Sequence, residues 1–223
     1  NTMLQMRDSK LPVIAAPVGM SIGGGFEVVL HADHVVSHAN SVMGLVESFV
    51  GVVPAGGGCK EMLYRWTEKL NDTQKGAWKS FMNIGLGRKA NSPQEADALA
   101  MRRADDVFQM NRDRILNIAL SKLDDTKKAS QRSPLALSGA EHFKEMLEWL
   151  EVNNKKGMLT PHDVTVGTEI GRIMSGGDCP AGTVFSEQEI LDAERSSFIT
   201  LAQTQETQAR IVSMLDNGVT LRN

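Results

Sequence analysis

The sequence predicts an α/β protein whose strands lie near the start of the chain and whose remaining length is mainly helical. Two observations predict this class. Residues from about Lys10 to Leu63 are rich in glycine, valine and alanine and poor in charge, whereas the sequence from about Tyr64 onward is charged and carries clear helix starts. Short apolar runs between glycine turns favour buried strands, and capped segments with periodic apolar residues favour helices.

In the first part of the chain we expect strands, glycine turns and short helices to alternate. The run at 11–16 is apolar with β-branched residues, which is typical of a buried strand. The expected elements are, in order, a strand at 11–16, a glycine turn at 19–25, a short helix that starts at Phe26–Leu30 and ends near Asp33, a strand at 34–38, a loop, a second glycine turn at 51–58 and a helix from Cys59 to Trp66.

The later part of the chain carries recognisable helix ends. Ser92 and Ser186 are each followed three residues later by a glutamate, which predicts a capping box. Thr160 stands directly before Pro161, which predicts another capped helix start. Gly218 follows an apolar run and is a candidate C-cap. The polar stretch from 129 to 134 ends in proline and is the best candidate for a boundary between parts of the chain.

Composition excludes several classes of function. The 223 residues include 24 basic and 27 acidic side chains, a net charge of −3, so we expect no nucleic-acid partner, because phosphate binding needs a basic surface. No apolar run approaches the ~20 residues of a membrane span, and residues 1–10 are too polar for a secretory signal. Cys59 and Cys179 are far apart, which predicts free thiols in a reducing, cytoplasmic compartment.

The most informative segment is Gly19–Glu27, which contains the first glycine turn and its three consecutive glycines, Gly23–Gly25. Three glycines before a helix let a ligand approach the backbone and leave N–H groups at the helix N-terminus, where the helix dipole favours negative charge. Such a site binds a phosphate or stabilises an oxyanion. The competing interpretation is tight packing of a helix on a strand, and this turn alone favours neither. The spacing is not that of a dinucleotide fingerprint, and the second turn is not a P-loop.

Two glutamates, Glu27 and Glu47, lie in apolar sequence surroundings. Two partly buried carboxylates facing one cavity can hold a water molecule and exchange protons with it. For either residue alone, a structural role at a helix start or a turn is the more frequent outcome. His31, Asp33 and His34 do not share one helix face, so we expect no metal site. Ser21 lacks the hydrolase elbow pattern.

Together these residues resemble the crotonase (enoyl-CoA hydratase/isomerase) superfamily. The matching runs are Leu11 to Asp33 and Met43 to Gly58, which agree in order, spacing and residue type. The remainder is similar to one branch, the hydratase portion of bacterial bifunctional 3-hydroxyacyl-CoA dehydrogenases. The branch-like runs include Gly-Gly-Gly-Cys-Lys-Glu after the second turn, Leu191-Asp-Ala-Glu-Arg, Arg210-Ile-Val-Ser-Met-Leu and the final Leu221-Arg-Asn.

The resemblance implies a role for each matching residue. Gly24 would donate its N–H to the oxyanion, and Glu27 and Glu47 would be the catalytic pair; the presence of both favours hydration over isomerisation. The neighbouring Gly23, Gly25, Ala55 and Gly56 would line the substrate site. Asp33 matches a recurrent structural position, and Ala55 stands where many relatives have glycine.

The resemblance also implies an organisation. We expect the C-terminal part of a ββα spiral at 1–70, a helical region that completes the crotonase domain at 71–133, and an α-helical extension at 134–223. The family domain normally begins earlier, with the second oxyanion donor and much of the coenzyme A surface, so the chain would be a fragment. Hydration needs no metal or redox cofactor, and NAD would enter only through the absent dehydrogenase part.

The function implied is hydration of a trans-2-enoyl-CoA to a 3-hydroxyacyl-CoA in fatty-acid β-oxidation. The expected partners are the acyl-CoA substrate, the absent dehydrogenase part and further copies in a homo-oligomer. Two alternatives stay open: an isomerase that moves the double bond of an acyl-CoA, and a non-catalytic docking fragment whose helices hold the parent protein together. Amphipathic segments such as Phe143 to Leu150 motivate the second alternative.

Overall fold

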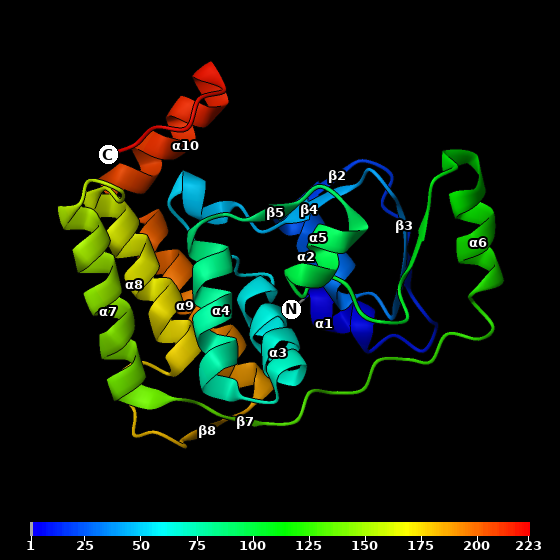
Figure 1. Cartoon of the computed structure of the whole chain (residues 1–223), viewed down its shortest axis with the longest axis horizontal. Coiled ribbons are helices and arrows are strands. Elements are labelled where there is room, and N and C mark those ends of the chain that lie inside the picture. Colours follow the sequence, from blue (N-terminus) through cyan, green and yellow to red (C-terminus); the bar gives the residue numbers. More distant parts are fainter. Residues whose placement is uncertain (1) are drawn as a thin grey trace. The chain divides into compact units, whose positions relative to one another are not determined.

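The computed structural model describes residues 2–223, which form two compact units (Figure 1). The first unit comprises residues up to 45 together with 89–132, and the second comprises 46–88 and 133–223. The chain passes from one unit to the other for the last time between Arg132 and Ser133, inside the polar stretch that the sequence singles out. Within the described residues, no helix combines the length and apolarity that a membrane crossing requires.

The first unit carries parallel strand pairs with helices, in keeping with the predicted α/β class. β1, β3 and β6 form one parallel sheet, while β2 pairs parallel and β5 antiparallel with β4. Its described elements are α1 (Thr2–Arg7), β1 (Ile14–Ala15), β2 (Met20–Ile22), α2 (Gly24–His31), β3 (His34–His38), β4 (Val42–Gly44), β5 (Lys89–Ala90), α5 (Pro93–Ala98), β6 (Val107–Gln109), the 3₁₀ helix η2 (Arg112–Arg114) and α6 (Ile115–Ser121).

The helix α2 and the strand β3 confirm two predictions, but the strand predicted at 11–16 is shorter. Only Ile14 and Ala15 join the sheet. Pro12 has no N–H to donate, and the N–H of Val13 donates instead to Oδ2 of Asp33, at 2.7 Å. The regular ladder therefore begins after these two residues.

The segment predicted as a turn at 19–25 contains a strand. Met20–Ile22 pairs with Val42–Gly44, a segment for which the sequence predicts a loop. A strand of three residues is too short to show a period of two, so its partner in the sheet decides its conformation rather than its own pattern.

A small apolar core lies between the β1–β3–β6 sheet and α6. Val36 is fully buried and packs with Ile115 and Ala119. Asp33 ties this region together, because its carboxylate accepts the N–H groups of Val13 and Ala129 and pairs with Lys128 at 2.7 Å. The structural role expected for Asp33 is confirmed.

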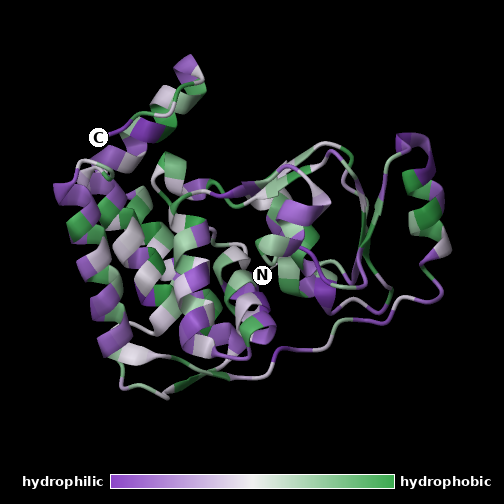
Figure 2. Cartoon of the chain, in the orientation of Figure 1, coloured by the Kyte–Doolittle hydropathy of each residue, from purple (hydrophilic) through white to green (hydrophobic). Residues whose placement is uncertain are grey.

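The second unit is mainly helical, and its helices carry hydrophobic and hydrophilic residues side by side, as Figure 2 shows. The predicted amphipathic helix around 143–150 is part of α7. The described elements are η1 (Glu47–Val50), α3 (Gly58–Leu70), α4 (Thr73–Gly85), β7 (Leu135–Ala136), α7 (Gly139–Lys155), α8 (Pro161–Ser175), β8 (Val184–Phe185), α9 (Glu187–Ala202) and α10 (Gln205–Asn217).

The predicted helix ends agree closely with the structure. Thr160 and Ser186 each form a complete capping box, and Gly218 ends α10 in the left-handed conformation with φ 66°. Ser92 caps α5 as expected, but the reciprocal bond differs, since Oε2 of Glu95 accepts the N–H of Asn91 instead of that of Ser92.

Glycines allow close helix contacts in this unit. A Cβ added to Gly76 on α4 would lie 2.6 Å from Oγ1 and 2.7 Å from the backbone nitrogen of Thr67 on α3. A Cβ on Gly167 of α8 would lie 2.5 Å from a methyl carbon of Leu150 on α7. These helix pairs approach closely because the contact residue has no side chain.

Replacing Gly76 by alanine should lower the free energy of unfolding by about 1–3 kcal/mol, because backbone atoms of Thr67 cannot move aside for the new methyl group. Gly85→Ala in the same helix is the matched control, since a Cβ there meets nothing within 4 Å. Its better helix propensity should leave stability unchanged or raise it by up to about 1 kcal/mol. Urea unfolding of both variants measures the difference, and equal midpoints would contradict the close contact.

The segments predicted at 1–70, 71–133 and 134–223 divide the chain differently from the two compact units. The units interleave along the sequence, because residues 46–88 pack with the C-terminal helices. The two units are defined by packing, whereas the three segments follow from the resemblance to a family. The units therefore do not test the segments, which stay a prediction.

Candidate active site

The first glycine turn leads directly into α2. Gly23 adopts φ 57° at the N-cap, a conformation that favours glycine. Its N–H donates to the carbonyl of Gly44 on β4 at 2.9 Å, and its own carbonyl accepts the N–H groups of Phe26 and Glu27. Gly23 therefore fixes the direction in which the helix leaves the sheet.

The next two glycines leave the start of α2 open. Gly24 and Gly25 are exposed, and in the described part of the chain no acceptor takes their N–H groups. A Cβ on Gly25 would meet nothing within 4 Å. Two N–H donors at the positive end of a helix dipole are thus available to an external oxygen atom.

Glu27 stands beside this open helix start. The residue is 6% exposed, and a Cβ on Gly24 would lie 4.0 Å from its Oε2 atom. Its backbone carbonyl accepts a hydrogen bond from Nδ1 of His31, at 2.7 Å. The first unit therefore brings together one carboxylate and two free N–H donors.

Glu47 is the first residue of η1 in the second unit. The residue is half-buried, and both of its carboxylate oxygens are shielded from solvent. The turn ends at Gly51, whose φ of 87° requires the left-handed region. Glu27 and Glu47 belong to different units, so each carboxylate is placed within its own unit.

The second glycine turn, with Ala55 and Gly56, precedes α3 in the same unit as Glu47. Ala55 is half-buried and has no positive φ, so its backbone conformation does not require glycine. Oε1 of Glu194, on α9, accepts the N–H of Lys60 at 2.5 Å. A carboxylate of the chain itself thus occupies the N-terminus of α3, in contrast to the open start of α2.

The side chain of Lys60 is fully buried at this same end of α3. Its Nζ pairs with Glu61 at 2.8 Å and with Glu187 of α9 at 2.7 Å. Buried charges persist only when they are paired. The Lys-Glu sequence after the second glycine turn therefore fastens α9 to α3.

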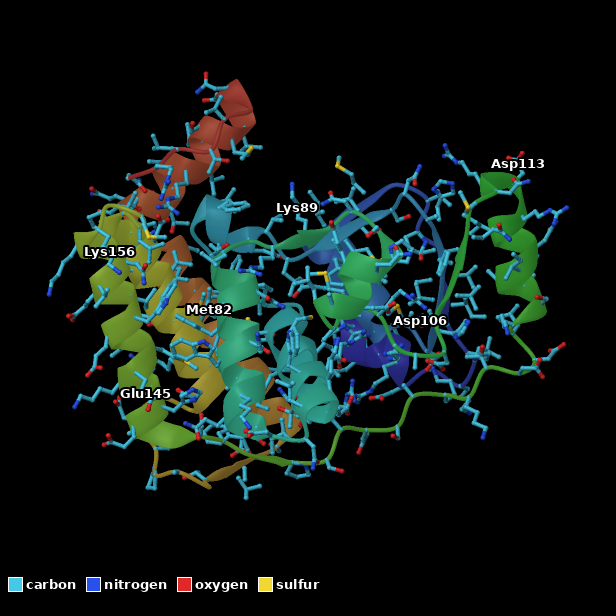
Figure 3. All side chains as sticks on the ribbon, in the orientation of Figure 1. Met82, Lys89, Asp106, Asp113, Glu145 and Lys156 are labelled. Atoms are coloured by element: carbon cyan, nitrogen blue, oxygen red, sulfur yellow. The ribbon has the colours of Figure 1, made fainter. Side chains whose placement is uncertain are left out.

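Two of the three residues considered as metal ligands, His31 and Asp33, have other partners. His31 bonds the carbonyl of Glu27, and Asp33 holds Lys128. His34, with Asp105 and Asp106, forms a group whose ligand atoms lie within 4.8 Å of one another. Both carboxylate oxygens of Asp106, labelled in Figure 3, already accept backbone N–H groups, from Val35 and Arg103, which gives Asp106 a structural role.

Sequence reasoning assigned no role to three residues that the structure places around the second glycine turn and η1. These are Glu194 at the start of α3, and Thr207 and Arg210, which bond the carbonyls of Gly51 and Ser48. The runs that contain Glu194 and Arg210 were noted for their resemblance to one branch of the family. The resemblance marks these runs in the sequence, but it does not indicate which residues they contact.

A family comparison covers the segment that carries these residues. Residues 1–69, which include both glycine turns and both glutamates, match the model of the enoyl-CoA hydratase/isomerase family. Among solved structures, an enoyl-CoA hydratase from Rhodobacter sphaeroides 2.4.1 is similar to this chain with a TM-score of 0.61 at 18% identity, over 99% of this chain and 66% of that one. At this identity the likeness shows the fold.

Two curated relatives cover nearly the whole chain. The Bacillus subtilis (strain 168) protein named "Probable 3-hydroxyacyl-CoA dehydrogenase" is 32% identical over 100% of this chain and 29% of its own length. A Rickettsia prowazekii (strain Madrid E) protein, named as a trifunctional enzyme of the fatty acid oxidation complex, is 26% identical over 96% of this chain and 27% of its own length. The chain thus spans less than a third of these relatives.

Proposed function

We propose that this chain, whose residues 1–69 match the enoyl-CoA hydratase/isomerase family, supplies the hydratase site for a trans-2-enoyl-CoA. The product is the 3-hydroxyacyl-CoA. The observation that carries the proposal is the open start of α2, where the unused N–H of Gly24 lies beside the buried carboxylate of Glu27.

The free N–H groups of α2 suit the charge that develops during hydration. Attack of water on the β-carbon of the enoyl thioester moves electrons onto the carbonyl oxygen and creates an enolate. A fixed N–H donor at the positive end of a helix stabilises this charge as it forms. Gly24 has the required donor and no side chain to block the approach.

The two glutamates suit the proton transfers. One carboxylate takes a proton from the attacking water, and the pair delivers one proton to the α-carbon, so the substrate gains the elements of water and the pair as a whole neither gains nor loses a proton. Hydration by this route uses no cofactor. In this proposal NAD serves only the dehydrogenase activity of a larger protein.

The relatives' names support a wider context for the same site. Both relatives are several times longer than this chain, and one is named as a dehydrogenase. We place the site in a bifunctional β-oxidation protein of the cytoplasm, whose dehydrogenase part oxidises the 3-hydroxyacyl product. Cys59 and Cys179 are free thiols, which suits a reducing compartment.

A product assay on the protein at its full natural length tests the proposal. Crotonyl-CoA should give 3-hydroxybutyryl-CoA, while a 3-enoyl-CoA should remain unchanged. Conversion of the 3-enoyl-CoA to the 2-enoyl-CoA without hydration would instead indicate isomerase activity, which the name of the matching family also includes. No turnover of either thioester, from a protein that carries all the segments of its longer relatives, would favour a non-catalytic docking role.

A further inference from the structure

The turn that carries Glu47 is short and depends on its neighbours. Its own hydrogen bonds join Phe49 N–H to Val46, Gly51 N–H to Ser48 and Val52 N–H to Glu47, at 3.1–3.2 Å. A single 3₁₀ turn has poor hydrogen-bond geometry and little stability of its own. The position of Glu47 is therefore set by the elements that pack against this turn.

Thr207 of α10 holds one end of the turn. The residue is fully buried, and its hydroxyl donates to the carbonyl of Gly51 at 2.7 Å. A threonine hydroxyl has only one proton, and here it is given to Gly51. In the 2.8 Å hydrogen bond between Thr207 and His162, Nε2–H of His162 is therefore the donor and Oγ1 of Thr207 is the acceptor. Burial lowers the pKa of His162, and the nearby Arg210 lowers it further, so the imidazole is held neutral with its proton on Nε2.

The fit between α10 and the turn leaves no spare room. A Cβ on Gly51 would lie 2.6 Å from Oγ1 of Thr207 and 3.0 Å from Nε2 of His162. The left-handed conformation of Gly51 and its missing side chain are both needed for this approach. The turn therefore moves only if α10 moves with it.

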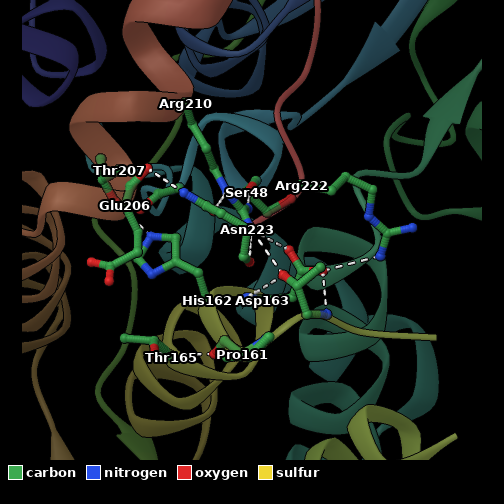
Figure 4. Close-up of polar contacts among 12 residues, drawn as sticks. Ser48, Pro161, His162, Asp163, Thr165, Glu206, Thr207, Arg210, Arg222 and Asn223 are labelled. Atoms are coloured by element: carbon green, nitrogen blue, oxygen red, sulfur yellow. Dashed lines mark hydrogen bonds and ion pairs between the residues drawn. The ribbon is translucent and has the colours of Figure 1, made fainter. Parts of the chain in front are cut away.

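Arg210, one helical turn further along α10, holds the middle of the turn. Its side chain is 2% exposed, and Nη1 donates to the carbonyl of Ser48 at 3.3 Å. Figure 4 shows how the rest of the guanidinium is fixed by Asp163 at 2.8 Å and by Asn223. Although burial alone would raise it, bonds from Thr160 and Arg210 lower the pKa of Asp163, so this carboxylate remains charged.

We propose that Thr207 and Arg210 are positioning residues for Glu47, which they hold through the carbonyls of Gly51 and Ser48. This inference rests on the proposed hydratase function. Displacement of a reacting group by about 1 Å costs on the order of 100-fold in rate. The helix α10 therefore contributes to the chemistry without touching the substrate.

Thr207→Val tests the proposal, because it keeps the shape of the buried side chain and removes only the hydroxyl. We expect hydrogen exchange of the backbone amides at 46–52 to become about fivefold to tenfold faster, as the loss of one hydrogen bond implies. On crotonyl-CoA, kcat should fall about tenfold or more while KM stays within twofold. Thr207→Ser restores the hydroxyl and should rescue both measurements.

Ser213→Ala is the matched control on the same helix. Its hydroxyl donates to the carbonyl of Val219 and not to the turn, so exchange at 46–52 and kcat should both remain unchanged. Arg210 is less suitable for substitution, because its several buried contacts put folding at risk.

Three outcomes overturn the inference. Unchanged exchange at 46–52 in Thr207→Val would show that the hydroxyl does not hold the turn. Faster exchange with unchanged kcat, in a protein that Glu47→Gln inactivates, would overturn the positioning role and leave the hydratase function intact. Full hydration by Glu47→Gln would overturn the proposed function itself, and the positioning role with it.

Discussion

Glu47→Gln should lower kcat for the hydration of crotonyl-CoA by about 10²–10⁴-fold, the usual contribution of a general acid–base group. The neutral amide keeps the shape of the side chain but takes no proton from water. Because both oxygens of Glu47 are shielded from solvent, bulk water is a poor substitute for the carboxylate. Steady-state rates on the protein at its full natural length, together with the Kd of a saturated acyl-CoA, measure the effect.

Binding of the acyl-CoA should survive this substitution, because the contact that we propose for the thioester oxygen is with α2 and not with Glu47. Glu141→Gln, an exposed change in the first turn of α7, is the control and should retain full turnover. Wild-type hydration by Glu47→Gln would refute the catalytic role of this residue.

Gly24→Pro should lower kcat by about 10²–10³-fold, as removal of one oxyanion donor does in other enzymes. Proline removes the N–H and is tolerated at the first position of a helix, which Gly24 occupies in α2. The helix should therefore form while its donor is lost. Circular dichroism checks the fold, and the rate with crotonyl-CoA checks the donor.

Gly24→Ala provides the comparison, since it keeps the N–H and adds only a methyl group. That methyl would meet Oε2 of Glu27 at 4.0 Å, an ordinary contact. If the N–H is the oxyanion donor, alanine should retain much more kcat than proline. Equal losses in the two variants would indicate that space at this position matters, and not the donor.

Local signals explain which parts of the fold could be predicted. The capping boxes at Thr160 and Ser186 depend on residues three positions apart, so the sequence alone specifies them. The strand β4 was missed because it has three residues and finds its partners, β2 and β5, elsewhere in the chain. Pairings of two or three residues leave no periodic pattern to detect.

The same distinction applies to the candidate site. Gly24 and Glu27 are three residues apart, so their meeting at one helix start could be predicted from the sequence. Glu194 reaches the start of α3 across 134 positions, and Arg210 reaches Ser48 across 162. Only folding reveals such contacts, and the roles of Glu27 and Glu47 stay predictions until the variants are measured.

The bond from Thr207 to Gly51 has a consequence for biosynthesis. It joins residues 156 positions apart, and a ribosome that adds ~5–20 residues per second needs roughly 8–30 s to travel from one to the other. During that interval the nascent Glu47 turn has no helix α10 to close against. The glycine start of α2 therefore emerges before α10, whereas the environment of Glu47 is completed only after α10 has left the ribosome.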